Sequence, residues 1–139
     1  IDRSTGKYFL LDYIAVEDVG TALFPILIEG QILGGIVQGI SQALGESLIY
    51  DETGQLSTGS FMDYQMPIAS DFPKFRIKTY PVKTKINPLG AKGVGESGTV
   101  GALAATLSAI QDALKSEGSD AVEMPATPNR IWKKLNNVK

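Results

Sequence analysis

Residues 30–50, GQILGGIVQGISQALGESLIY, combine a helical pattern of apolar side chains with interior glycines. The apolar residues at helical spacing are Ile32, Leu33, Ile36, Val37, Ile40, Leu44 and Leu48. Each glycine inside a helix costs about 1 kcal/mol relative to alanine, so Gly34, Gly35, Gly39 and Gly45 require a compensating role. The usual role is close approach of another backbone or of a ligand. Polar side chains interrupt the run, so we expect a buried helix and no membrane span.

The segments before and after this helix predict two strands and two irregular connections. Residues 8–16 are rich in aromatic and branched side chains and follow a turn-like segment at 4–7, which suggests a strand leaving a hairpin. Residues 75–82 alternate between apolar and polar side chains, as a strand does. Glycine and proline punctuate residues 17–25 and 60–75, and we expect loops there.

Two further helices are predicted towards the end of the chain. Over residues 99–118 the expected buried stripe consists of Val100, Leu103, Ala104, Leu107, Ile110 and Leu114. Gly118 is the expected C-cap of that helix. Residues 126–135 place Thr127 as an N-cap before Pro128 at the first helical position. Helices and strands do not alternate regularly, so the sequence predicts an α+β fold with about three helices and a small number of strands. Residues 1–139 are expected to form a single domain or a fragment of one.

The composition excludes several classes of site. The chain has no cysteine and no histidine, so it offers no disulfide, no ordinary zinc site, no cysteine-ligated iron–sulfur cluster and no Ser-His-Asp triad. Net charge is −2 with scattered basic residues, which argues against nucleic-acid binding. A cysteine-free chain is compatible with the cytoplasm. The chain starts at Ile1 without a recognisable signal peptide, and we expect a piece of a longer protein.

Residues 87–98, NPLGAKGVGESG, allow three interpretations: a structural turn, a phosphate-binding loop, or a catalytic loop presenting Glu96. Residues 93–98 match GxGxxG, and Glu117 lies near the distance expected of a ribose-binding acid. However, the dinucleotide fingerprint needs a strand running into its first glycine, and Pro88 with mostly polar neighbours precedes it here. Spacing alone favours a turn entering a helix, with Glu96 as a favourable charge near the helix start.

NPLGAKGVGESG also resembles the signature near the end of the molybdenum hydroxylases, the family of xanthine dehydrogenase, aldehyde oxidoreductase and carbon monoxide dehydrogenase. Further segments resemble the family in the family's order: residues 13–20, 29–46, 50–56, 63–73 and 124–132. The resemblance therefore covers almost the whole chain. It implies the C-terminal part of the large, molybdopterin-binding subunit.

The resemblance also implies roles for individual residues. Glu96 would be the general base that removes a proton during hydroxylation of a carbon. Cofactor-binding roles carry over to Gln38, Gly39, Lys92, Gly93, Val94 and Gly95, with no metal ligand among this chain's side chains. Other roles remain open for some of these residues. Gln38 can be an exposed helix residue, the helix glycines can serve packing only, and Lys92 can be structural or pair with a phosphate.

The family further implies a molybdenum–molybdopterin cofactor, in the cytosine dinucleotide form, shared with segments outside this chain. A 2Fe-2S cluster and FAD are expected only on partner domains or subunits, so the chain alone should be inactive. Aldehydes, N-heterocycles and carbon monoxide are the candidate substrates. Two alternatives are a non-catalytic assembly module and a nucleotide-binding module that uses GVGESG. Ser97 stands where alanine is common in the family, and residues 23–30, LFPILIEG, also depart from its usual pattern.

Overall fold

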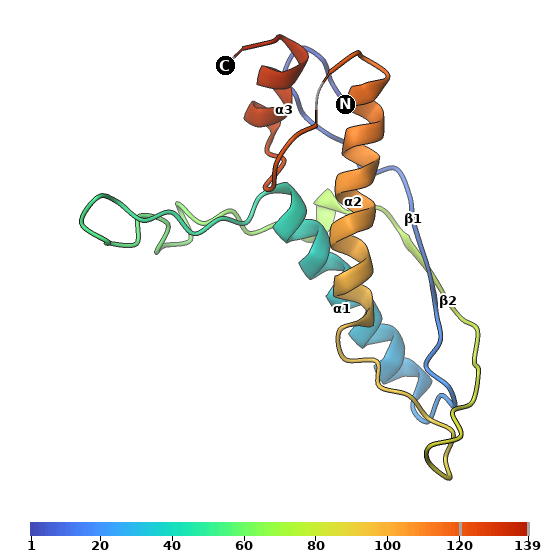
Figure 1. Ribbon diagram of the computed structural model, residues 1–139. Coiled ribbons are helices and arrows are strands. Elements are labelled where there is room, and N and C mark those ends of the chain that lie inside the picture. Colours follow the sequence, from blue (N-terminus) through green and yellow to red (C-terminus); the bar gives the residue numbers. More distant parts are fainter. Residues whose placement is uncertain (120, 139) are drawn as a thin grey trace.

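The computed structural model describes residues 1–119 and 121–138 and has an α+β fold (Figure 1). The elements in chain order are β1 (Tyr13–Glu17), α1 (Pro25–Leu44), a 3-10 turn (Ala69–Asp71), β2 (Phe75–Thr79), α2 (Ser97–Lys115) and α3 (Pro128–Leu135). The predicted fold class is therefore confirmed, with three α-helices and a two-stranded sheet in the described part of the chain. None of the helices in the described ranges has the length and apolarity needed to span a membrane.

The two long helices pack against each other along rows of residues spaced four apart. The row on α1 is Ile32, Ile36, Ile40 and Leu44, and the row on α2 is Gly98, Ala102, Thr106, Ile110 and Leu114; all are buried. Figure 1 shows α1 and α2 crossing at an angle, with the end of α2 extending beyond α1. Rows of this spacing interlock as ridges and grooves, and this helix pair forms the centre of the hydrophobic core.

Glycines allow close backbone contact where α2 begins. A Cβ on Gly39 would lie 2.6 Å from the carbonyl oxygen of Thr99, and one on Gly35 would lie 3.0 Å from the Thr99 nitrogen. A Cβ on Gly98 would overlap the carbonyl oxygen of Ile32. Helix packing therefore accounts for Gly35 and Gly39. It does not account for Gly34, whose added Cβ would have no described atom within 4 Å.

The sheet is parallel, so the predicted hairpin at residues 4–16 is wrong. Tyr13 pairs with Phe75 and Ala15 with Ile77. Parallel strands need a long crossover, which α1 and the segment after it supply. The apolar run predicted as one strand is divided, because Tyr8 and Leu10 pack against the core outside any strand.

The bounds of α1 also differ from prediction. The helix begins at Pro25, inside the segment expected to be a loop, and proline suits the first turn because its missing N–H would have no intrahelical partner there. It ends at Leu44, with Gly45 as the cap. The predicted helix over 30–50 therefore begins and ends too late, and Leu48 lies outside it, exposed to solvent.

The buried stripe of α2 is only partly as predicted. Ile110 and Leu114 are buried, but Val100 and Ala104 face solvent. The glycine-lined face of α1 instead selects the small residues Gly98 and Ala102 for the closest contact. Apolar periodicity cannot identify such a row, because glycine contributes little to it.

The observed end of α2 and the observed start of α3 agree more closely with those predicted from the sequence. α2 ends at Lys115 with Ser116 as its cap, and Gly118, the expected cap, lies two residues beyond with φ +71°. The predicted N-cap of α3 is confirmed: Thr127 Oγ1 accepts a hydrogen bond from the Arg130 backbone nitrogen at 3.4 Å, and Pro128 is the first helical residue.

Residues 46–66 form an arm that extends away from the helices (Figure 1). A bridge between Tyr50 and Leu56 closes its tip. Phe61 and Met62 are 88% and 96% exposed. The arm therefore presents large apolar side chains outside the core.

Candidate functional site

The glycine-rich segment 87–98 lies at the end of the molecule where α1 begins (Figure 1). Its first half is fixed to the chain that follows β1. The Lys92 nitrogen donates to the Val19 carbonyl at 3.0 Å, and the Thr21 nitrogen donates to the Gly90 carbonyl at 2.9 Å. A β-bridge joins Gly20 to Ala91 between these bonds. The segment is thus anchored by backbone pairing well before it reaches Glu96.

Asp18 strengthens this attachment with its side chain. Its Oδ2 accepts from the Lys92 ammonium at 2.5 Å, and its Oδ1 accepts from the backbone nitrogens of Gly20 and Val82, each at 2.9 Å. These hydrogen bonds, with that from Lys92 the strongest, lower the pKa of Asp18 to about 2. One carboxylate therefore joins the chain after β1, the chain after β2 and the glycine-rich segment.

We predict that the attachment through Asp18 weakens in acid. The folded-state pKa of about 2 lies below the ordinary value of 3.8. The contribution of Asp18 to stability is therefore present above pH 3.8 and is lost as the pH falls towards 2. When thermal unfolding is measured between pH 7 and pH 2, the melting temperature should fall less in Asp18→Asn than in the wild type. Lys92→Met should reduce the loss as well, because it removes the main cause of the shift. Identical pH dependence in all three proteins would contradict the prediction.

The second half of the segment is held by α1. The Gln31 side-chain nitrogen donates to the Gly95 carbonyl at 2.7 Å. Glu96 follows at the N-cap position of α2 with an exposed side chain that makes no capping hydrogen bond. Its carboxylate therefore makes no hydrogen bond to the helix start and is accessible from outside.

The other predicted cofactor residues lie around this loop. Thr99 Oγ1 donates to the Gln38 side-chain oxygen at 3.3 Å, which places Gln38 beside the first turn of α2. A Cβ added to Gly93 or Gly95 would have no described atom within 4 Å, whereas Val94 packs against the core. The loop thus has a fixed inner side and an open outer side that a bound group can approach.

A groove of about 480 Å³ lies next to the loop. Its lining includes Leu23, Phe24, Leu27, Gln31, Lys92 and Gly95. Apolar walls with a few polar groups are typical of ligand sites. Among residues 1–119 and 121–138, no three carboxylates gather into a possible metal site. The polar groups that line the groove include the Gln31 carboxamide, the Lys92 ammonium and backbone atoms, which can hydrogen-bond a ligand.

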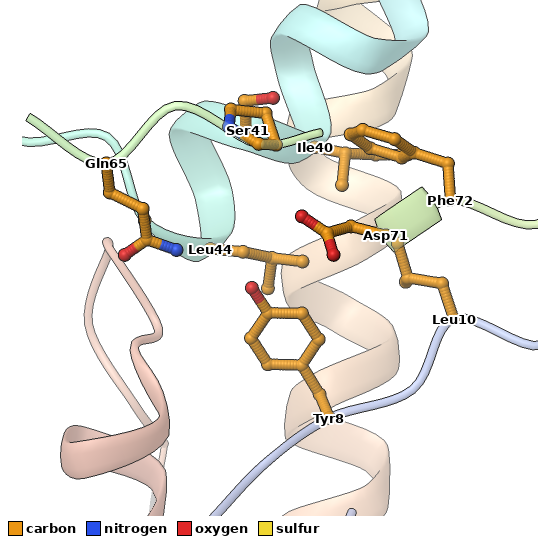
Figure 2. Close-up of a pocket in the computed structure, with 10 residues that line it drawn as sticks. Tyr8, Leu10, Ile40, Ser41, Leu44, Gln65, Asp71 and Phe72 are labelled. Atoms are coloured by element: carbon orange, nitrogen blue, oxygen red, sulfur yellow. The ribbon is translucent and has the colours of Figure 1, made fainter. Parts of the chain in front are cut away.

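A second cavity lies at the opposite end of α1, between Leu44 and the base of the arm (Figure 2). Its volume of about 30 Å³ has room for water but not for a cofactor. The Tyr8 ring points into it, and burial, together with the nearby Asp71 carboxylate, raises the pKa of Tyr8. We interpret this cavity as a packing feature.

Comparison with known proteins identifies the family. Residues 1–73 match the family described as molybdopterin cofactor-binding domain. The chain belongs to the molybdenum hydroxylases. It is 44% identical over 131 residues to the nicotine 6-hydroxylase large subunit of Paenarthrobacter nicotinovorans, a match that covers 94% of this chain and 16% of that protein.

Two solved structures of molybdenum hydroxylases are similar over nearly the whole chain. Quinoline 2-oxidoreductase from Pseudomonas putida 86 is 43% identical with a TM-score of 0.93, covering 98% of this chain and 17% of that one. Carbon monoxide dehydrogenase from Oligotropha carboxidovorans is 35% identical with a TM-score of 0.93, covering 99% and 17%. The chain therefore spans about a sixth of the length of these relatives.

The structure brings all the sequence-predicted residues of this molybdenum hydroxylase segment to one region. Glu96, Lys92, Gly93, Val94 and Gly95 share the loop, and Gln38 and Gly39 lie on the α1 face that packs against the residues after it. Two details differ from the simplest expectation. The Lys92 ammonium pairs with Asp18, and Gly39 faces α2.

Sequence reasoning missed two residues of the site. Asp18 and Gln31 were not singled out, although each contacts the predicted loop. Both lie within segments that resemble the family, which is the only signal that pointed to them. The loop also lacks the arrangement of a dinucleotide fingerprint, because β2 ends at Thr79 and irregular chain intervenes before Gly93.

Proposed function

We propose that this chain is the C-terminal part of the large subunit of a molybdenum-dependent hydroxylase and that Glu96 is its general base. The observation that carries the proposal is the position of Glu96: it is exposed at the end of an anchored loop, next to the groove-lining Gly95, and its side chain makes no capping hydrogen bond. Membership of the family supports a role in hydroxylation for this carboxylate. Its exposure suits a general base, because a base must reach the proton it removes.

In this proposal each residue has a limited task. A bound molybdopterin cofactor would supply the redox chemistry of hydroxylation. A carboxylate oxygen of Glu96 accepts the proton released during attack on the substrate carbon. The Gln38 amide, which can both donate and accept, would hydrogen-bond the bound cofactor, while Gly93 and Gly95 would leave room for it. Lys92 fixes the loop through Asp18, and Val94 anchors it in the core.

The proposal extends to the cofactor form and the partners. We expect the cytosine dinucleotide form of molybdopterin, a cytoplasmic location, and iron–sulfur and flavin domains or subunits that accept the electrons. The chain spans about a sixth of its relatives, so we expect it to be inactive until joined to the remainder of the large subunit. We call that whole assembly the complete enzyme.

Metal and substrate analysis of the complete enzyme tests the proposal. We expect about one molybdenum and one pterin per large subunit, and absence of both would contradict it. N-heterocycles should be assayed first, because the relatives named for nicotine and quinoline share 44% and 43% identity with this chain. Carbon monoxide and aldehydes follow. A metal-loaded enzyme that hydroxylates or oxidises none of these would favour the assembly-module alternative.

A separate titration addresses the nucleotide-binding alternative. We expect no saturable binding of NAD or FMN to the 139-residue chain, because no strand runs into the glycine motif. Isothermal calorimetry should show only the heat of dilution. Binding with low-micromolar affinity that is lost in Gly93→Val would overturn our preference for the molybdopterin role.

A further inference from the structure

Gln31 makes an unusual contact for a helix side chain. It lies in the second turn of α1, and its carboxamide nitrogen donates to the carbonyl of Gly95, the residue immediately before Glu96. The two residues are separated by 64 positions in the chain. A long helix anchored in the core thus reaches the backbone next to the proposed base.

The contact belongs to a continuous face of α1. Gln31, Gly35, Gln38 and Gly39 follow helical spacing and therefore share one side of the helix. Gly35 faces the Thr99 nitrogen, Gln38 accepts from the Thr99 hydroxyl, and Gly39 faces the Thr99 carbonyl. This face therefore fixes the backbone at Thr99, which follows Glu96 in the chain. Gln31 fixes it at Gly95, which precedes Glu96.

In the described ranges, no hydrogen bond other than that of Gln31 joins residues 93–95 to a distant part of the chain. The hydrogen bonds of Val94 and Ser97 stay within the loop, and the ion pair of Asp18 acts earlier, at Lys92. Gly93 and Gly95 contribute no side chain and tolerate many backbone conformations. Val94 packs against the core, but Gly95 separates it from Glu96, so without the Gln31 bond the backbone would be free to rotate at Gly95.

We propose that Gln31 is a positioning residue that keeps Glu96 within reach of its proton; the proposal rests on the proposed function of Glu96. Proton transfer requires the base at hydrogen-bond distance, and displacement of about 1 Å can cost about 10²-fold in rate. Loss of one hydrogen bond should therefore lower kcat about tenfold. KM should change much less, because the bond acts on the base and not on bound substrate.

The test uses Gln31→Met in the complete enzyme, which keeps the length of the side chain and removes the donor. Gln42→Met is the matched control, because Gln42 is exposed on the same helix three turns away. We expect normal molybdenum content in both variants and an approximately tenfold fall in kcat only in Gln31→Met. Amide hydrogen exchange at residues 94–97 should also accelerate only in Gln31→Met. Unchanged kcat and unchanged exchange would overturn the proposal, and so would a fall in molybdenum content that matches the loss of activity.

A double-variant cycle separates positioning from a general structural effect. If Gln31 acts through Glu96, Gln31→Met should cause no further loss in the Glu96→Gln background. Full multiplication of the two losses would overturn the positioning role. Wild-type activity in Glu96→Gln alone would instead refute the proposed base, while the exchange comparison would still decide whether Gln31 holds the loop.

Discussion

Glu96→Gln should lower hydroxylation by the complete enzyme by about 10²–10⁴-fold, the range typical of losing a general base. The change keeps the size and planar shape of the side chain but removes its ability to accept the proton. The Glu96 side chain makes no capping hydrogen bond, so the helix start loses only the interaction of this charge with the helix dipole, about 0.3–1 kcal/mol. Molybdenum content should therefore remain at the wild-type value and the melting temperature should fall only slightly, while kcat falls steeply.

The matched control is Glu52→Gln, which removes the same charge from an exposed position on the arm. It should leave kcat unchanged. Steady-state kinetics and metal analysis of both variants distinguish a lost base from a lost cofactor. Turnover of Glu96→Gln at the rate of the control would refute the assignment.

Gly98→Ala should clearly destabilise the packing of α1 against α2. The new Cβ would overlap the Ile32 carbonyl oxygen and lie 3.0 Å from the Ile36 nitrogen. Both are backbone atoms of a helix and cannot rotate away, so α1 and α2 must separate. Overpacking of this kind costs about 1–3 kcal/mol. Thermal unfolding followed by circular dichroism should show a clear decrease in melting temperature.

Gly101→Ala provides the opposite case in the same helix. A Cβ at Gly101 would have no described atom within 4 Å, so alanine adds helix propensity without a clash. Stability of the 139-residue chain should rise by about 1 kcal/mol. If both alanine variants change stability in the same direction, close helix packing does not explain Gly98.

Local signals in the sequence predicted where the helices lie better than they predicted which residues pack against other elements. Thr127 before Pro128 correctly located the start of α3, because capping depends on adjacent residues. Periodicity found α1 and α2 but misplaced the buried row of α2, since Gly98 and Ala102 carry almost no hydrophobic signal. The parallel pairing of β1 and β2 was out of reach, because strand direction depends on a crossover that propensity does not encode.

The candidate site shows the same division. The resemblance to a known family singled out Glu96 and its loop, and the structure places that loop beside a groove. It could not assign Asp18 or Gln31 a task, because their contacts join segments 74 and 64 residues apart. An aspartate after a strand and a glutamine near a helix start are ordinary in composition, and only the three-dimensional arrangement shows what they bind.

The exposed arm has a practical consequence for following assembly. Met62 lies on it at 96% exposure, and Met66 lies at its base. Exposed methionine is readily converted to its sulfoxide, which adds a mass that peptide analysis detects. Mild peroxide treatment should therefore oxidise Met62 rapidly in the 139-residue chain and slowly wherever another part of the protein covers the arm. The rate of Met62 oxidation therefore measures whether the arm is covered, without any introduced label.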